Sequence, residues 1–137
     1  MAAILRIKLQ FLDNWNQKRK EIAKWYFKKL PHTFPDIILP HVPEWSDPCW
    51  HQFVIRSQRR YVLKNRLNEN GIPTIVHYPV PPHLQEAYSH LNYKKGSFPI
   101  SEKISDEVLS LPMGLHLTKE ILESSVFNLG MKKIIST

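Results

Sequence analysis

Proline residues set the strongest limits on how this chain can fold. The sequence holds 11 prolines among 137 residues, and most of them gather in two stretches. Proline fixes φ and lacks the backbone N–H used by helices and sheet ladders, so both stretches predict extended or turn structure. The first stretch, residues 31–50, contains Pro31, Pro35, Pro40, Pro43 and Pro48, and the second contains Pro79, Pro81 and Pro82. Helices and strands are therefore expected before, between and after these stretches.

Residues 2–30 are predicted to form one long helix that Pro31 ends. Apolar side chains recur there at steps of three and four, as on one face of an α-helix. These apolar positions are Leu5, Leu9, Leu12, Trp15, Ile22, Tyr26 and Leu30. The sequence starts in helical pattern without a capping residue, which suggests a piece of a longer chain.

Between the two proline stretches the pattern alternates between strand and helix. β-Branched and aromatic residues predict strands over residues 50–57 and 74–78. The helix between them is expected over residues 58–70, with Ser57 as its N-cap and Gly71 just past its end.

After the second proline stretch we expect mostly helical structure. A short helix is predicted over residues 83–91, then a turn at residues 94–96 and a helix over 101–108. A short strand over 110–113 and a last helix over 119–135, with Thr118 as its N-cap, complete the prediction. Few strands and many helices indicate an α+β domain, in which helices cover one face of a small, mostly antiparallel sheet.

Charge and composition exclude several classes of protein. No apolar run reaches the roughly 20 residues that a membrane span needs, and no signal peptide is recognised at the start. Cys49 is the only cysteine, so we expect a reduced thiol in a cytoplasmic protein, without an internal disulfide. The formal net charge of +7 is compatible with an anionic partner, although solvated helix faces explain most groups of basic residues.

The segment from His77 to Gln85 carries the candidate site residues. It places His77, Tyr78 and His83 beside a turn locked by prolines, and such turns at strand ends often form binding sites. A purely structural turn with surface histidines fits the same residues equally well. We find no glycine-rich phosphate loop and no histidine spacing suited to a metal, so neither a cofactor site nor a metal site is predicted in this chain.

Several blocks together resemble one enzyme family. AAILRIKL followed by LDNWNQKRKEIAKWY is similar to the interdomain helix of the DegT/DnrJ/EryC1/StrS aminotransferases. WHQFVIR, NENGIPTIVHYPVPPHLQEAY and GSFPISEKISDEVLSLPMGLHLT resemble consecutive blocks of the family's C-terminal small domain, in family order and spacing. The resemblance runs from about Ala2 to about Leu129 and is closest to members that make amino-dideoxy sugars on thymidine diphosphate.

The resemblance implies a function for the whole protein and a limited role for this chain. Family members have the aspartate-aminotransferase-like fold, form homodimers and transfer an amino group to a keto nucleotide-sugar with pyridoxal phosphate (PLP). The Schiff-base lysine and the acidic partner of the pyridine ring lie in the large domain, upstream of the region seen here. We therefore expect residues 1–30 to be the interdomain helix, residues 31–137 the small domain, and the chain alone to be inactive. No catalytic residue is transferred to this chain, but the resemblance places His77 and Tyr78, and with less support His83, at the substrate pocket.

Two other functions are weighed against this one. The first is a stand-alone basic module that binds nucleic acid or a protein partner, although its aromatic residues fall at core-like spacings and nucleic acid is not the expected partner. The second is a complete small enzyme with another mechanism, for which no acid–base pair or activated nucleophile stands out. The small-domain hypothesis predicts an apolar face left exposed on residues 2–30, where the large domain packs. Salt-dependent binding to nucleic acid would instead favour the basic module.

Overall fold

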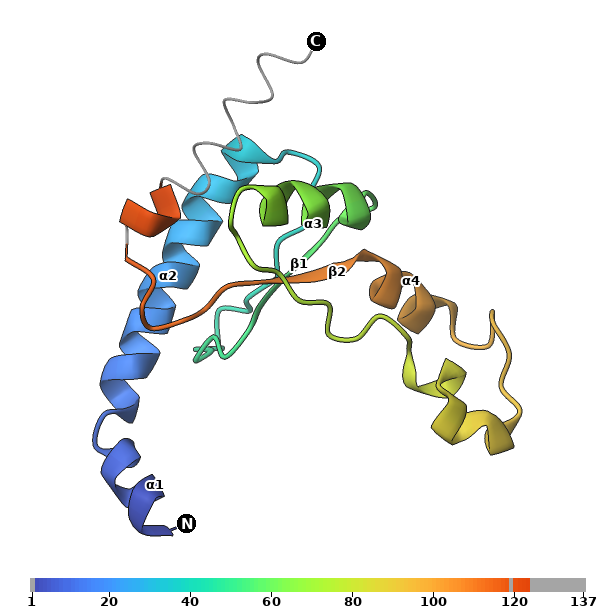
Figure 1. Cartoon of the computed structure of the whole chain (residues 1–137), viewed down its shortest axis with the longest axis horizontal. Helices are drawn as coiled ribbons and strands as arrows, with labels where there is room; N and C mark the ends of the chain where they lie inside the picture. Colours follow the sequence, from blue (N-terminus) through green and yellow to red (C-terminus); the bar gives the residue numbers. More distant parts are fainter. Residues whose placement is uncertain (1, 119, 124–137) are drawn as a thin grey trace.

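The structure is a computed structural model that describes residues 2–118 and 120–123. Its elements are, in chain order, α1 (Ala2–Leu9), α2 (Leu12–Thr33), β1 (Phe53–Arg56), α3 (Arg60–Glu69), the 3-10 helices η1 (Pro82–Leu84) and η2 (Glu86–Leu91), α4 (Pro99–Glu107) and β2 (Val108–Leu111). Figure 1 shows α1 and α2 following one another along one side of the molecule, with the two strands at its centre. Residues 80–107 extend away on the other side, and we call them the arm.

β1 and β2 form an antiparallel sheet in which Val54 lies opposite Ser110. Single bridges widen this sheet at both edges, with Ile38 beside Arg56 and Ile75 beside Ser110. The expected α+β fold with a small antiparallel sheet is confirmed. None of the helices in the described part of the chain is long and apolar enough to cross a membrane.

One face of the sheet packs against α2 and α3 to form the core. Phe53 and Ile55 on β1 lie opposite Leu111 and Leu109 on β2, and all four side chains are buried. Helix α2 contributes Ile22, Ala23, Tyr26 and Leu30, and α3 contributes Leu63 and Leu67. Alternating residues of a strand point to opposite faces, so Val54 and Ser110 belong to the face away from this core.

The prediction of one helix over residues 2–30 is wrong at Gln10 and Phe11, where a turn separates α1 from α2. The Gln10 and Phe11 N–H groups donate to the carbonyl groups of Ile7 and Lys8, three residues back, and this tightens the end of α1. No residue of α1 is buried. Helices gain most of their stability from packing, and among the described residues no contact buries a side chain of α1 to favour a continuous helix at that point.

The prediction that Pro31 ends the helix is also wrong, because α2 continues to Thr33. The Phe34 N–H donates to the carbonyl of Leu30 at 2.8 Å, so one further turn closes beyond the proline. Proline in this last turn removes only the bond that its own N–H would make to Phe27. Leu30 is buried in the core and holds the turn in place.

The predicted strands are longer than, or displaced from, the observed ones. Trp50 has a φ of 55°, in the left-handed region, so β1 begins only at Phe53. The predicted strand over 74–78 is reduced to the bridge at Ile75, after which the chain leaves the sheet for the arm. β2 ends at Leu111 because Pro112 has no N–H to continue the ladder, which moves the strand predicted over 110–113 toward the N-terminus.

Both predicted N-cap side chains accept a backbone hydrogen bond near a helix start. The prediction that Ser57 is the N-cap of α3 is wrong, because a turn precedes the helix, which begins at Arg60 with Arg59 as its N-cap. The Ser57 Oγ accepts from the Arg59 N–H at 3.2 Å within that turn. Thr118 Oγ1 accepts from the Ile121 N–H at 3.4 Å. Residues 120–123 are helical, and the rest of the helix predicted over 119–135 lies outside the described residues.

The arm contains more irregular structure than predicted. The helix expected over 83–91 is divided into η1 and η2, because Gln85 between them is extended, with a ψ of 144°. The turn at 94–96 is confirmed, with Gly96 at a φ of 94°. Helix α4 begins at Pro99 and ends at Glu107, close to the predicted span of 101–108.

Candidate functional site

His77 and Tyr78 lie where the chain leaves the edge of β2. His77 is half-buried, and its Nδ1 lies 2.9 Å from the Oγ of Ser110 on β2. The Tyr78 ring meets the His77 ring edge to face, with centroids 5.7 Å apart, and Tyr78 is 69% exposed. The peptide bond that joins the two residues is cis. The structure thus brings together an anchored imidazole and an exposed phenol, two groups that can bind oxygen-rich ligands.

The proline turn that follows is fixed by contacts within the arm. Pro81 is buried, and the Gln85 side chain donates a hydrogen bond of 3.0 Å to the carbonyl of Val80. The Leu84 N–H donates to the carbonyl of Pro81 at 2.9 Å, which closes η1. These bonds hold the start of the arm in a defined shape next to His77 and Tyr78.

His83 is engaged inside the arm. Its Nε2 lies 3.0 Å from Oε1 of Glu102, and its side chain is only 8% exposed. Its ring also contacts Phe98 edge to face, with centroids 4.8 Å apart. The structure therefore pairs His83 with α4, and no hydrogen bond joins it to His77 or Tyr78 within the described residues.

Glu102 fixes the loop that enters α4. Its carboxylate accepts from the Gly96 N–H at 2.8 and 2.9 Å and from the Phe98 N–H at 3.3 Å. The Gly96 bond is the main reason that the pKa of this carboxyl lies below its ordinary value, and His83 and Phe98 act in the same direction while burial opposes them. Sequence reasoning missed Glu102, although an acidic residue in the first turn after Pro99 is a usable signal.

A second ion pair joins β1 to the last residue of α4. Arg56 Nη2 and Nε both donate to Oε2 of Glu107, at 2.6 and 3.0 Å, and the Glu107 side chain is 8% exposed. Glu107 and Ser110, the partner of His77, were both missed by sequence reasoning. Each lies far along the chain from the residue that it contacts, and no local pattern identifies such pairs.

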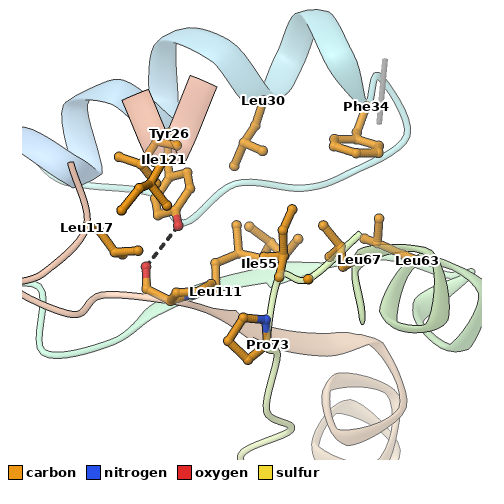
Figure 2. A pocket seen from close by; sticks show the side chains of 14 residues that line it. Tyr26, Leu30, Phe34, Ile55, Leu63, Leu67, Pro73, Leu111, Leu117 and Ile121 are labelled. Carbon is orange, nitrogen blue, oxygen red and sulfur yellow. Dashed lines mark hydrogen bonds between the residues drawn. The ribbon is translucent and has the colours of Figure 1, made fainter. Parts of the chain in front are cut away.

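A small apolar gap lies in the core. Figure 2 shows it between α2 and the strands, with Leu117 and Ile121 on one side and Leu63 and Leu67 on the other. The Tyr26 hydroxyl is already bonded to the carbonyl of Pro112, as the dashed line marks. A volume of about 60 Å³ is far below the roughly 300 Å³ of small ligand pockets, so this gap cannot hold a nucleotide sugar.

Comparison with known proteins decides the family. Residues 1–128 match the model of the DegT/DnrJ/EryC1/StrS aminotransferase family. The chain belongs to this family. The expectation drawn from the sequence blocks is thereby confirmed.

Two relatives within the aminotransferase family show how much of a longer protein this chain matches, and one of them is named as a sugar transaminase. The chain is 45% identical over 125 residues to dTDP-3-amino-3,6-dideoxy-alpha-D-galactopyranose transaminase from Aneurinibacillus thermoaerophilus, covering 91% of this chain and 33% of that protein. It is 43% identical over 128 residues to the erythromycin biosynthesis sensory transduction protein EryC1 from Saccharopolyspora erythraea, covering 93% of this chain and 35% of that protein. The chain therefore spans about a third of the length of these relatives.

A solved structure of the family has the same fold over nearly the whole chain. The similarity is to DesV from S. venezuelae in complex with a ketimine intermediate, with a TM-score of 0.85 and 38% sequence identity. The match covers 99% of this chain and 36% of that one. The fold described above therefore corresponds to about a third of the DesV chain.

The described residues do not fit the family's cofactor, PLP. A Schiff-base lysine needs an enclosed site where burial or a neighbouring charge activates its amine. All lysines in the described ranges are exposed or half-exposed, and Lys20 is paired with Asp47 at 2.5 Å. The same ranges contain no group of three histidine, cysteine or acidic residues suited to a metal ion.

Proposed function

We propose that this chain is the C-terminal small domain of a PLP-dependent aminotransferase that transfers an amino group to a keto nucleotide-sugar. The observation that supports this most is the family match over residues 1–128, which covers only about a third of each relative. The two thirds of the relatives that have no counterpart here leave room for a large domain. PLP, when bound there, supplies the electron sink for amino transfer.

In this proposal the chain forms a wall of the substrate pocket and is inactive alone. His77 is anchored by Ser110, and Tyr78 is exposed beside it, so both can bind the hydroxyl or phosphate oxygens of a nucleotide sugar. His83 is a weaker candidate, since its Nε2 is already bound to Glu102. Its proposed contribution is to hold the arm that follows Tyr78.

The large domain is proposed to cover α1 and the start of α2. Leu5, Leu9 and Phe11 are each at least half exposed, and apolar clusters of this kind mark interaction surfaces. We call Ile4, Leu5, Ile7, Leu9, Phe11 and Leu12 the α1 apolar face. Residues 1–30 are then the interdomain helices, and residues 31–137 are the small domain.

The assembly and cellular location proposed here follow those of the family. We propose a homodimer of the complete enzyme in the cytoplasm, with Cys49 as a free thiol. Cys49 is exposed and is not part of a disulfide. A reduced compartment is the ordinary environment for such a residue.

The alternative of a basic binding module is not favoured. One group of basic residues in the sequence comprises Arg56, Arg59, Arg60, Lys64 and Arg66. Three of its arginines are engaged within the chain, since Arg56 pairs with Glu107, Arg59 pairs with Asp36 and Arg60 is 2% exposed. A nucleic-acid surface needs free cations that can neutralise phosphates.

A chimera tests the proposal. The matched third of the A. thermoaerophilus transaminase is replaced by this chain, and amino transfer from glutamate to the dTDP-linked keto sugar is measured. We expect activity in the chimera and none in the isolated chain. A second chimera with His77→Ala and Tyr78→Phe should fold but transfer more slowly. A folded, cofactor-loaded chimera without activity on any nucleotide-linked keto sugar would contradict the proposal.

A further inference from the structure

We propose that Ser110 sets the position of the proton on His77. It holds the neutral imidazole with its proton on Nε2, so that this nitrogen can donate a hydrogen bond to an oxygen of the nucleotide sugar. Ser110 touches no substrate in this scheme and is a positioning residue that acts through His77. The substrate step rests on the proposed function, whereas the position of the proton does not.

Ser110 is held firmly enough to orient a neighbour. Its backbone N–H donates to the carbonyl of Ile75 at 2.8 Å, and the Ile75 N–H donates back at 3.3 Å. On the other side Ser110 lies opposite Val54 in the β1–β2 ladder. The residue is 6% exposed, so its Oγ approaches His77 from a fixed and nearly dry position.

The buried hydroxyl group of Ser110 needs an acceptor for its own proton. Nδ1 of His77 is its one hydrogen-bond partner within residues 2–118 and 120–123. If Nδ1 carried the imidazole proton, it would donate to Oγ, and the hydroxyl proton would be left without an acceptor in a buried place. If the hydroxyl donates to Nδ1, a single bond satisfies both groups. A neutral imidazole then carries its proton on Nε2.

The other ring nitrogen of His77 remains available. Nε2 makes no hydrogen bond to any described residue. Among the described residues, the polar side-chain atoms that are both buried and without a hydrogen bond are Trp25 Nε1 and Arg60 Nε. Nε2 of His77 has no hydrogen bond and is not one of these buried atoms, so it is accessible to solvent. An exposed N–H donor suits the oxygen acceptors of a sugar hydroxyl or a diphosphate, and Tyr78 supplies a second polar group beside it.

The position of the proton can be measured on the chain itself. Two-bond ¹H–¹⁵N correlation spectra of a chain labelled with ¹⁵N-histidine, at alkaline pH, report which nitrogen of each imidazole is protonated, and a His77→Gln variant assigns the His77 signals. We expect His77 to be in the Nε2–H form. A proton on Nδ1 would overturn the inference regardless of any variant.

Three serine variants distinguish an effect of the Ser110 hydroxyl on the His77 proton from a general effect on the stability of the fold. Ser110→Ala should convert His77 to a mixture of both neutral forms, and Ser110→Thr, which keeps a hydroxyl, should retain the Nε2–H form. Ser105→Ala is the matched control, because Ser105 is also buried but its side chain makes no hydrogen bond within the described residues. Backbone spectra check that each variant folds. An unchanged His77 signal in folded Ser110→Ala would overturn the role of Ser110.

Kinetics of the chimera test the substrate step separately. Ser110→Ala should raise KM for the nucleotide sugar roughly fivefold, the effect of one weakened hydrogen bond, with a smaller change in kcat. Ser105→Ala should leave both constants unchanged. If Ser110→Ala shifts the proton of His77 but leaves KM unchanged, the substrate step alone is refuted. An inactive parent chimera would count against the proposed function. The spectra of the isolated chain would still show which nitrogen of His77 carries the proton.

Discussion

The hydroxyl group of Tyr26 donates a hydrogen bond of 2.8 Å to the carbonyl oxygen of Pro112, which ties α2 to the segment after β2. The two residues are 86 positions apart in the chain. Tyr26 is 3% exposed, and burial raises the pKa of its phenol, so the hydroxyl remains a donor at neutral pH. This bond crosses the apolar core at the edge of the gap seen in Figure 2.

Replacing this tyrosine tests how much the bond stabilises the domain. Tyr26→Phe keeps the ring and leaves the Pro112 carbonyl without its donor, so the free energy of unfolding should fall by about 1 kcal/mol. Urea titration followed by circular dichroism measures the change. Tyr61→Phe is the control, since Tyr61 is 69% exposed and should show almost no effect. Equal effects from both variants would contradict this role.

Gly71 should resist replacement by alanine. Its φ is 75°, and the N–H groups of Gly71 and Ile72 donate to the carbonyls of Asn68 and Leu67, which closes α3 in a Schellman motif. An added Cβ meets nothing within 4 Å, so the cost comes from the backbone and should be about 1 kcal/mol for Gly71→Ala. Thermal unfolding checks this value. Gly71→Asn should cost less, and an alanine variant as stable as the parent would argue against a left-handed residue here.

Acidification should loosen the arm at Glu102. The folded-state pKa of this carboxyl is lowered, chiefly by the Gly96 N–H, so its stabilising effect is present above the pKa of an unfolded glutamate and is lost as the pH falls through the folded value. The amide signal of Gly96 should therefore titrate with a midpoint below the ordinary value for glutamate. Glu102→Gln should remove this titration, and Glu44→Gln should leave it intact. A midpoint at or above the ordinary value would contradict the geometry.

Negative charges introduced on the α1 apolar face should lower stability and activity only when the large domain is present. Leu5→Glu with Leu9→Glu changes side chains that are 55% and 63% exposed, so the isolated chain should keep its stability to within about 0.5 kcal/mol. In the chimera the same changes should lower the melting temperature and the activity, because two charges would be buried. Lys8→Glu, which alters charge without removing an apolar group, serves as the control. A chimera indifferent to both leucine changes would show that this face is not the interface.

The sequence predicts those parts of the fold that depend on short-range signals. Gly71 ends α3 as predicted, because a left-handed turn favours glycine. Ser57 lies two residues before the observed N-cap Arg59, so it marks the start of α3 only approximately. The break at Gln10 and Phe11 has no such signal, since the apolar pattern runs through it without interruption. The apolar pattern is typical of a helix face that packs against a partner. Whether the helix continues through Gln10 and Phe11 depends on that packing, which the sequence of this chain does not contain.

The sequence predicts the two neighbouring residues of the candidate site but not the residues that hold the site in place. The neighbouring residues His77 and Tyr78 can be selected because they adjoin a proline-locked turn. Ser110, which fixes His77, lies 33 positions away and reaches it through the ladder between Ile75 and β2. The pairing of His83 with Glu102 likewise depends on how η1 packs against α4 within the arm. Contacts of this length follow from tertiary structure, and single-sequence patterns do not contain them.

Reductive trapping of the cofactor tests the central claim, that this chain belongs to an aminotransferase but does not hold its cofactor lysine. The purified chain is incubated with PLP, reduced with borohydride, digested and analysed by peptide mass spectrometry. We predict no labelling, or weak labelling scattered over the exposed lysines. Stoichiometric labelling of one lysine in this chain would contradict the account, because the cofactor site would then lie within these residues.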